Sequence, residues 1–197
     1  IDQVCERGSC DFVMDLAAWL PLVMIGDALG FEEADRAQLL TWSDDLIRGL
    51  GAPDPAMADK AAAASIAYAE YIVEVIADRR AKPREDLITT LVHAEIDGDH
   101  PDAQALLYET LLILIGGDET TRHVITGGLY QLLADRSNWE ALRADRSLLP
   151  VAIEEMLRWV SPIKNMARTA TRDVEVRGKT IREGQKVLLV YPSANRD

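Results

Sequence analysis

The sequence predicts a mainly α-helical protein with short β-strands towards its C-terminal end. Apolar residues recur at helical spacing through most of the chain up to Val160. The longest such segment covers residues 102–135, and short β-like segments separated by glycines follow Ser161. The chain has 197 residues, of which 48% are hydrophobic. This is enough for one globular unit without a disulfide or a metal to stabilise it, so residues 1–197 are expected to form a single α-rich domain or a large part of one.

Residues that begin or end helices divide the chain into elements. Asp11 is placed to cap the first helix and Gly30 to end it, while Pro21 should kink it because proline removes a backbone donor. Ser147 and Pro150 are residue types that open a helix. Helices are expected over residues 12–29, 32–50, 56–81, 86–95, 102–135, 137–144 and 147–159, a loop over 51–55, and strands over 167–171, 174–176 and 186–191.

The charge and the cysteine content exclude several classes of protein. With 33 Asp+Glu against 21 Lys+Arg, the net charge is −12, and such a surface repels nucleic acid and anionic membranes. Cys5 and Cys10 are the only cysteines and have neither the number nor the spacing of a disulfide framework or a zinc site. His93, His100 and His123 form no ligand pair at helical spacing, so no metal site is expected in this chain.

No secretory signal or membrane span is expected. Asp11 and Asp15 interrupt the only early apolar stretch, and the longest unbroken apolar run, residues 111–115, is far shorter than the roughly 20 residues a membrane span requires. These features predict a cytoplasmic protein. Because the chain opens at Ile1 and ends on Asn-Arg-Asp without a closing element, it is expected to be truncated at both ends.

The centre of the long helix combines flexibility with polar chemistry. Gly116 and Gly117 weaken the helix, since each glycine costs about 1 kcal/mol relative to alanine, and they allow a bulky group to approach the backbone. The carboxylate of Glu119 and the hydroxyl of Thr120 follow directly, a pair that can pass protons and hold a water. Alternatively, the glycines end one helix and Asp118 caps another. The apolar pattern continues in phase beyond them, which favours one long helix.

Two later features are weak on their own. Glu155 and Arg158 are spaced i, i+3 and can pair on one helix face, but an ordinary surface salt bridge has the same spacing. Arg168 follows Pro162 on an extended segment. Arginine binds carboxylates in a two-pronged fashion, although a single arginine is often simply solvated.

Taken in order, these motifs resemble the haem-thiolate monooxygenases, the cytochromes P450. The glycine pair with an acid and a threonine, then Glu-x-x-Arg at Glu155, then Pro162 with Arg168, and finally Ala194-Asn-Arg-Asp extend the likeness over nearly the whole chain. The segments around Glu119 and Arg168 look most like actinobacterial members that hydroxylate sterol side chains or other lipids. The resemblance implies the central part of the P450 fold and the insertion of one atom of O2 into a C–H bond of a lipid or steroid-like, apolar small-molecule substrate.

The resemblance also implies roles for individual residues. Glu119 and Thr120 would deliver protons during oxygen activation; Gly116 and Gly117 would make room for haem b, and Arg168 would bind a haem propionate. Glu155 and Arg158 would form a buried structural pair. Ile113, Ile163 and Met166 would line the substrate pocket. Electrons would come from NAD(P)H through a ferredoxin and its reductase.

One family feature is absent from the printed sequence. The iron ligand of the family is a cysteine in a Phe-x-x-Gly-x-x-x-Cys-x-Gly loop that would lie downstream of Asp197, and neither Cys5 nor Cys10 has this context. The 197 residues alone are therefore expected to be inactive, with the activity belonging to the complete protein. The alternative is a non-catalytic helical protein, or a relic, that binds an apolar ligand between its helices.

Overall fold

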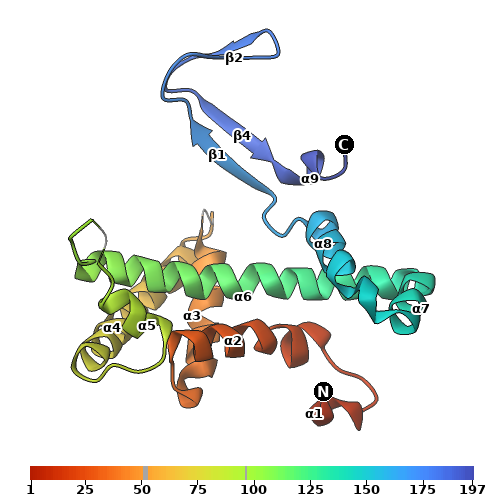
Figure 1. Cartoon of the computed structure of the whole chain (residues 1–197), viewed down its shortest axis with the longest axis horizontal. Coiled ribbons are helices and arrows are strands. Elements are labelled where there is room, and N and C mark those ends of the chain that lie inside the picture. Colours follow the sequence, from red (N-terminus) through yellow and green to blue (C-terminus); the bar gives the residue numbers. More distant parts are fainter. Residues whose placement is uncertain (51–52, 96) are drawn as a thin grey trace. The chain divides into compact units, whose positions relative to one another are not determined.

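A computed structural model describes residues 1–50, 53–95 and 97–197, which form two compact units, Ile1–Arg122 and His123–Asp197 (Figure 1). Residues 51 and 52 of the expected loop lie outside the described residues. The predicted long helix is confirmed: α6 covers Ala103–Ala134 and continues through both glycines. None of the helices in the described ranges has the length and hydrophobicity that a membrane crossing requires.

The first unit is helical. Its core contains apolar residues at helical spacing, such as Tyr68, Ile72 and Ile76 on one face of α4 and Leu106 and Leu114 on α6. These side chains are almost fully buried, and each contributes about 1.5–3 kcal/mol through the removal of apolar surface from water. The elements are α1 (Asp2–Cys5), a π-helical turn (Val13–Ala17), α2 (Trp19–Leu29), a 3-10 turn (Glu33–Asp35), α3 (Arg36–Gly49), α4 (Pro55–Ala81), α5 (Leu87–Val92) and the first part of α6.

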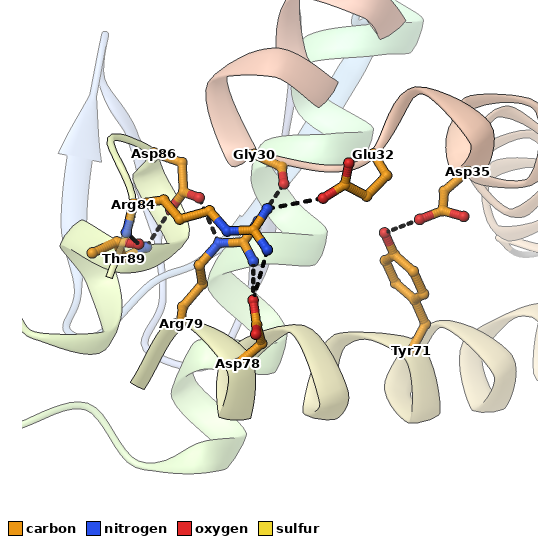
Figure 2. Close-up of polar contacts among 9 residues, drawn as sticks. All are labelled: Gly30, Glu32, Asp35, Tyr71, Asp78, Arg79, Arg84, Asp86 and Thr89. Atoms are coloured by element: carbon orange, nitrogen blue, oxygen red, sulfur yellow. Dashed lines mark hydrogen bonds and ion pairs between the residues drawn. The ribbon is translucent and has the colours of Figure 1, made fainter. Parts of the chain in front are cut away.

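A buried arginine connects three of these helices (Figure 2). Arg79, near the end of α4, donates from Nε to Asp86 Oδ2 at 2.6 Å, from Nη1 to Asp78 Oδ2 at 2.6 Å, and from Nη2 to the Gly30 carbonyl at the end of α2. Asp86 also caps α5 by accepting from the Thr89 amide at 2.7 Å. The side chains of Arg79 and Asp86 are only 4% and 3% exposed, so this is an ion pair within the protein interior.

Glycine is required where this network meets α2. Gly30 ends α2 with a φ of 82°, in the left-handed region, as the sequence predicted. A Cβ at this position would also lie 2.2 Å from Asp86 Oδ2. The backbone conformation and the close approach of the ion pair therefore both exclude a side chain here.

The second unit combines the end of α6 with short helices and two antiparallel strand pairs. In β1–β4, Asn165 pairs with Val190 and Thr169 with Lys186, and in β2–β3, Val174 pairs with Ile181. Gly127 and Gly128 let α8 approach α6 closely, because a Cβ at either position would lie within 2.7 Å of Val160 or Met156 atoms. The elements are α7 (Arg136–Ala144), a 3-10 turn (Arg146–Leu148), α8 (Leu149–Val160), β1 (Asn165–Thr169), β2 (Val174–Val176), β3 (Lys179–Ile181), β4 (Lys186–Val190) and α9 (Tyr191–Ala194).

The structure corrects several predicted boundaries. Asp11 caps the first helical turn as expected, because its carboxylate accepts hydrogen bonds from the backbone amides of Val13 and Met14. However, residues 13–17 form a π-helical turn before α2, so the helix expected over 12–29 is divided ahead of Pro21. Asp145, rather than Ser147, supplies the capping side chain before α8, by accepting from the Ser147 amide at 2.9 Å. Neither β3 nor α9, which are three and four residues long, was predicted from the sequence.

Candidate functional site

The centre of α6 has one buried face and one open face in the first unit. Residues four apart lie on the same face of a helix. We call the residues of the buried face the buried stripe and those of the open face the open stripe. Each residue of the buried stripe is at most 5% exposed, whereas those of the open stripe are exposed or half-buried. The buried stripe consists of Leu106, Thr110, Leu114, Asp118 and Arg122. The open stripe consists of Tyr108, Leu112, Gly116 and Thr120.

Thr120 is joined to the glycine one turn earlier. Its Oγ1 donates to the Gly116 carbonyl at 2.7 Å, a bond that a threonine hydroxyl forms readily within a helix. The hydroxyl oxygen still has acceptor capacity, and the residue is only half-buried. Thr120 can therefore hold a polar ligand or a water at the open stripe.

The two adjacent glycines, Gly116 and Gly117, have different surroundings. Apart from the backbone of α6 itself, no atom of the described residues lies within 4 Å of a Cβ placed at Gly116, so Gly116 leaves open space next to Leu112. A Cβ at Gly117 would lie 2.5 Å from Ile25 Cδ1 of α2. Gly117 therefore allows α2 and α6 to pack closely, which argues against the predicted role of Gly117 in making room for a ligand.

Substitution of each glycine by alanine should separate these two functions. Gly117→Ala is expected to lower the free energy of unfolding by about 1–3 kcal/mol, because the new methyl group overpacks the contact with Ile25. Gly116→Ala should raise it by up to about 1 kcal/mol through helix propensity. Urea unfolding followed by far-UV circular dichroism measures both. Equal effects of the two substitutions would show that Ile25 moves aside without cost.

The Glu119 carboxylate is one of three that lie around the Arg122 guanidinium group. Arg122 Nη2 lies 2.6 Å from Glu119 Oε1, 2.7 Å from Asp44 Oδ1 on α3, and 3.7 Å from Asp118 Oδ2. Asp118 is completely buried, and neither of its carboxylate oxygens has a partner with hydrogen-bond geometry among the described residues. The predicted acid is therefore part of a cluster in which three carboxylates share one guanidinium group.

Burial and charge act in opposite directions within this cluster. Burial raises the pKa of Asp118 above its ordinary value, and this effect outweighs the opposing influence of the Arg122 charge and the Ser43 hydroxyl. Burial by itself would lower the pKa of Arg122, but the hydrogen bond to Asp44 and the neighbouring carboxylates raise it. Arg122 thus stays positively charged in the interior.

Glu119 and Thr120 were predicted from the sequence, whereas the roles of Asp118, Arg122 and Asp44 were not. A signal for two of them was present, because Asp118 and Arg122 continue the four-residue spacing of Leu106, Thr110 and Leu114. Charged residues in phase with a buried stripe must find partners in the interior. Asp44 carries no such local signal, because it lies 78 residues before Arg122.

The Glu155–Arg158 pair forms, but it is exposed. Arg158 Nε donates to Glu155 Oε2 at 2.7 Å, and the guanidinium group also reaches the Asn195 carbonyl. The side chains of Glu155 and Arg158 are 57% and 42% exposed among the described residues, and the burial of this pair remains a prediction for the complete protein. Glu155 and Arg158 lie on a face of α8 that the described parts of the second unit leave uncovered.

The remaining predicted residues lie in different places. Ile113 is half-buried and packs against the core of the first unit, so Leu112, which is 65% exposed, is the large apolar side chain next to Gly116. Arg168 on β1 and the nearby Ile163 and Met166 are exposed in the second unit. Their predicted contacts with haem and substrate remain predictions. No group of three or more His, Cys, Asp or Glu side chains in the described ranges could hold a metal ion.

Comparisons with known proteins identify relatives over the whole chain. The steroid C26-monooxygenase of Mycolicibacterium smegmatis is 52% identical over 198 residues, which cover 100% of this chain and 49% of that protein. A methyl-branched lipid omega-hydroxylase of Mycobacterium bovis is 38% identical over 95% of this chain and 44% of its own length. The chain thus spans about half the length of the curated relatives it matches.

Structural comparison and a family model agree with these relatives. The crystal structure of CYP109E1 from Bacillus megaterium in complex with testosterone superposes with a TM-score of 0.90 and 31% identity, covering 100% of this chain and 53% of that one. The family model described as Cytochrome P450 matches residues 31–197. The mainly helical fold with short antiparallel strands is therefore the P450 fold that the motifs predicted, and the chain belongs to the cytochrome P450 family.

Proposed function

We propose that the complete protein is a haem-dependent monooxygenase that inserts one atom of O2 into a C–H bond of a steroid or another lipid. The observation that carries this proposal is the open stripe of α6, where an apolar surface with free space at Gly116 lies one turn before the Thr120 hydroxyl. The names of the relatives, a steroid C26-monooxygenase and a methyl-branched lipid omega-hydroxylase, support the substrate class.

The residues of the open stripe fit a flat, largely apolar group such as haem b. Leu112 offers exposed apolar surface, and in the part of the chain that the structure describes a Cβ at Gly116 would contact only its own helix. Gly116 would therefore allow the macrocycle to approach the helix backbone, and the exposed Arg168 would bind a propionate through charge-assisted hydrogen bonds. When bound, haem supplies the reductive activation of O2.

The protein supplies protons for the reaction. Hydroxylation consumes one O2, two electrons and two protons, and yields one alcohol and one water. Thr120 Oγ1, whose hydrogen is donated to the Gly116 carbonyl, would accept a hydrogen bond from a water at the open stripe, and the neighbouring Glu119 carboxylate would transfer protons from solvent to that water. We propose NAD(P)H as the electron source, with a ferredoxin and its reductase as partners.

Isotope labelling tests this function directly. The complete haem-loaded protein, supplied with NAD(P)H, a ferredoxin and its reductase, is expected to convert a steroid with a branched alkyl side chain into a mono-hydroxylated product. Under 18O2 the product should carry one 18O atom, and under 16O2 in H2 18O it should carry none. Mass spectrometry measures both. Substrate binding without any oxygenated product would instead favour a binding protein, and labelling from water would exclude a monooxygenase.

A further inference from the structure

Arg122 links the predicted acid to a different helix. The same nitrogen, Nη2, lies 2.6 Å from Glu119 Oε1 and 2.7 Å from Asp44 Oδ1, and the Arg122 side chain is only 6% exposed. Asp44 belongs to α3 (Arg36–Gly49), and its other carboxylate oxygen lies 3.7 Å from Arg48, which is 68% exposed. The buried end of this chain of charges is thus fixed between two helices, whereas the other end reaches solvent.

Three carboxylates compete for this guanidinium group. Asp118, Glu119 and Asp44 all lie within 4.0 Å of the one guanidinium group, and Asp118 is completely buried. Arg122 cannot satisfy three carboxylates equally, because a guanidinium group has a fixed planar set of donors. The strength of its contact with Asp44 therefore limits how tightly it holds Glu119.

We propose that Arg122, anchored on α3 by Asp44, is a positioning residue that holds the Glu119 carboxylate in place for proton transfer. This inference rests on the proposed function. Arg122 affects the reaction through Glu119, and α3 thereby affects proton delivery without touching the substrate. Loss of the anchor lets Arg122 move towards Glu119 and Asp118, which changes the orientation and the mobility of the acid.

Asp44→Asn is the most informative variant, because substitution of Arg122 itself would leave Asp118 buried without a counter-charge. In the complete haem-loaded enzyme, Asp44→Asn is expected to lower the product formed per NAD(P)H by about 3- to 10-fold, a part of what general acid catalysis contributes. The solvent deuterium isotope effect should change as well. Haem content and the carbon monoxide spectrum should stay the same, and Asp44→Glu should restore most of the coupling.

A second measurement reports on the acid itself. With 13C label at the side-chain carboxyl of glutamate, the NMR signal of Glu119 is assigned by its loss in Glu119→Gln. This signal is expected to shift in Asp44→Asn. Arg48→Gln is the matched control, because it also removes a partner of Asp44 but on the solvent side, and it should leave both the signal and the coupling unchanged. An unshifted signal in Asp44→Asn would contradict the inference.

A double-mutant cycle separates positioning from a general structural role. If Asp44 acts through Arg122 and Glu119, Asp44→Asn should cause no further loss of coupling in a Glu119→Gln background. Additive losses would mean that Asp44 affects the enzyme by another route, and the inference would be wrong. If Glu119→Gln alone leaves coupling unchanged, the inference is also wrong, whereas the labelling experiment decides the monooxygenase function independently.

Discussion

Replacement of Arg79 by methionine is expected to lower the free energy of unfolding by about 3–5 kcal/mol, the usual cost of removing one partner from a buried ion pair. The substitution keeps much of the apolar volume but leaves the Asp86 carboxylate, which is 3% exposed, without its guanidinium partner. It also removes the donor to the Gly30 carbonyl. The midpoint of urea unfolding, followed by far-UV circular dichroism in the complete protein, measures the effect.

Arg80→Met provides the matched control at the next position of α4. Arg80 is exposed, so its replacement should change stability by no more than about 0.5 kcal/mol. If the two variants unfold at the same urea concentration, the Arg79 network does not stabilise the fold. A change in the slope of the unfolding curve would point to an altered unfolded state instead.

The effect of Arg79→Met should also depend on pH. Burial alone would raise the pKa of Asp86, but hydrogen bonds from Thr89 and Arg79 more than offset this, and the pKa lies below its ordinary value. A carboxyl whose pKa is lowered by folding stabilises the fold above its unfolded pKa, and this contribution is lost as the pH falls through the folded value. The difference between wild type and Arg79→Met should therefore be full at neutral pH and shrink below about pH 4.

The elements that the sequence predicted well have a strong apolar period. The expected helix over 102–135 differs from α6 (Ala103–Ala134) by one residue at each end, because its apolar residues stay in phase across the glycines. The strand β3 and the short helix α9 carry no such period, since three or four residues complete no repeat. Their structure depends on tertiary pairing, as between Val174 and Ile181, which the local sequence does not encode.

Only those parts of the candidate site whose residues are neighbours in the sequence could be predicted. Glu119 and Thr120 are adjacent and follow a glycine pair, so their composition alone marks them. The partner of Arg122 on α3 and the contact of Gly117 with Ile25 are set by helix packing, which brings together residues far apart in the chain. The pairing of Glu155 with Arg158 was predictable from the i, i+3 spacing, but this spacing says nothing about which segments cover the pair.

Thr120→Ala is expected to lower the product formed per NAD(P)H by about 10-fold or more in the complete enzyme, within the range that general acid catalysis contributes. The electrons should instead be consumed in forming hydrogen peroxide. O2 that accepts two electrons and two protons is released as hydrogen peroxide when its O–O bond is not broken. NAD(P)H consumption should continue at a similar rate. Parallel assays of NAD(P)H, peroxide and hydroxylated product measure this uncoupling.

The hydrogen-bond geometry explains why this loss should be functional rather than structural. The Thr120 hydroxyl donates to the Gly116 carbonyl, which the α-helix already pairs with the backbone amide four residues later. Removal of the hydroxyl therefore leaves no buried group without a partner, and alanine is the better helix former. Haem content and thermal stability should stay near those of the wild type.

Two further substitutions at this turn of α6 make the experiment decisive. Thr120→Ser restores a hydroxyl at the same position and should recover coupling. Thr121→Ala removes a neighbouring hydroxyl that is exposed to solvent, and it should leave coupling unchanged. Loss of haem in Thr120→Ala would mean that Thr120 has a structural role, and equal uncoupling in Thr121→Ala would mean that the effect comes from the helix and not from the hydroxyl of the open stripe.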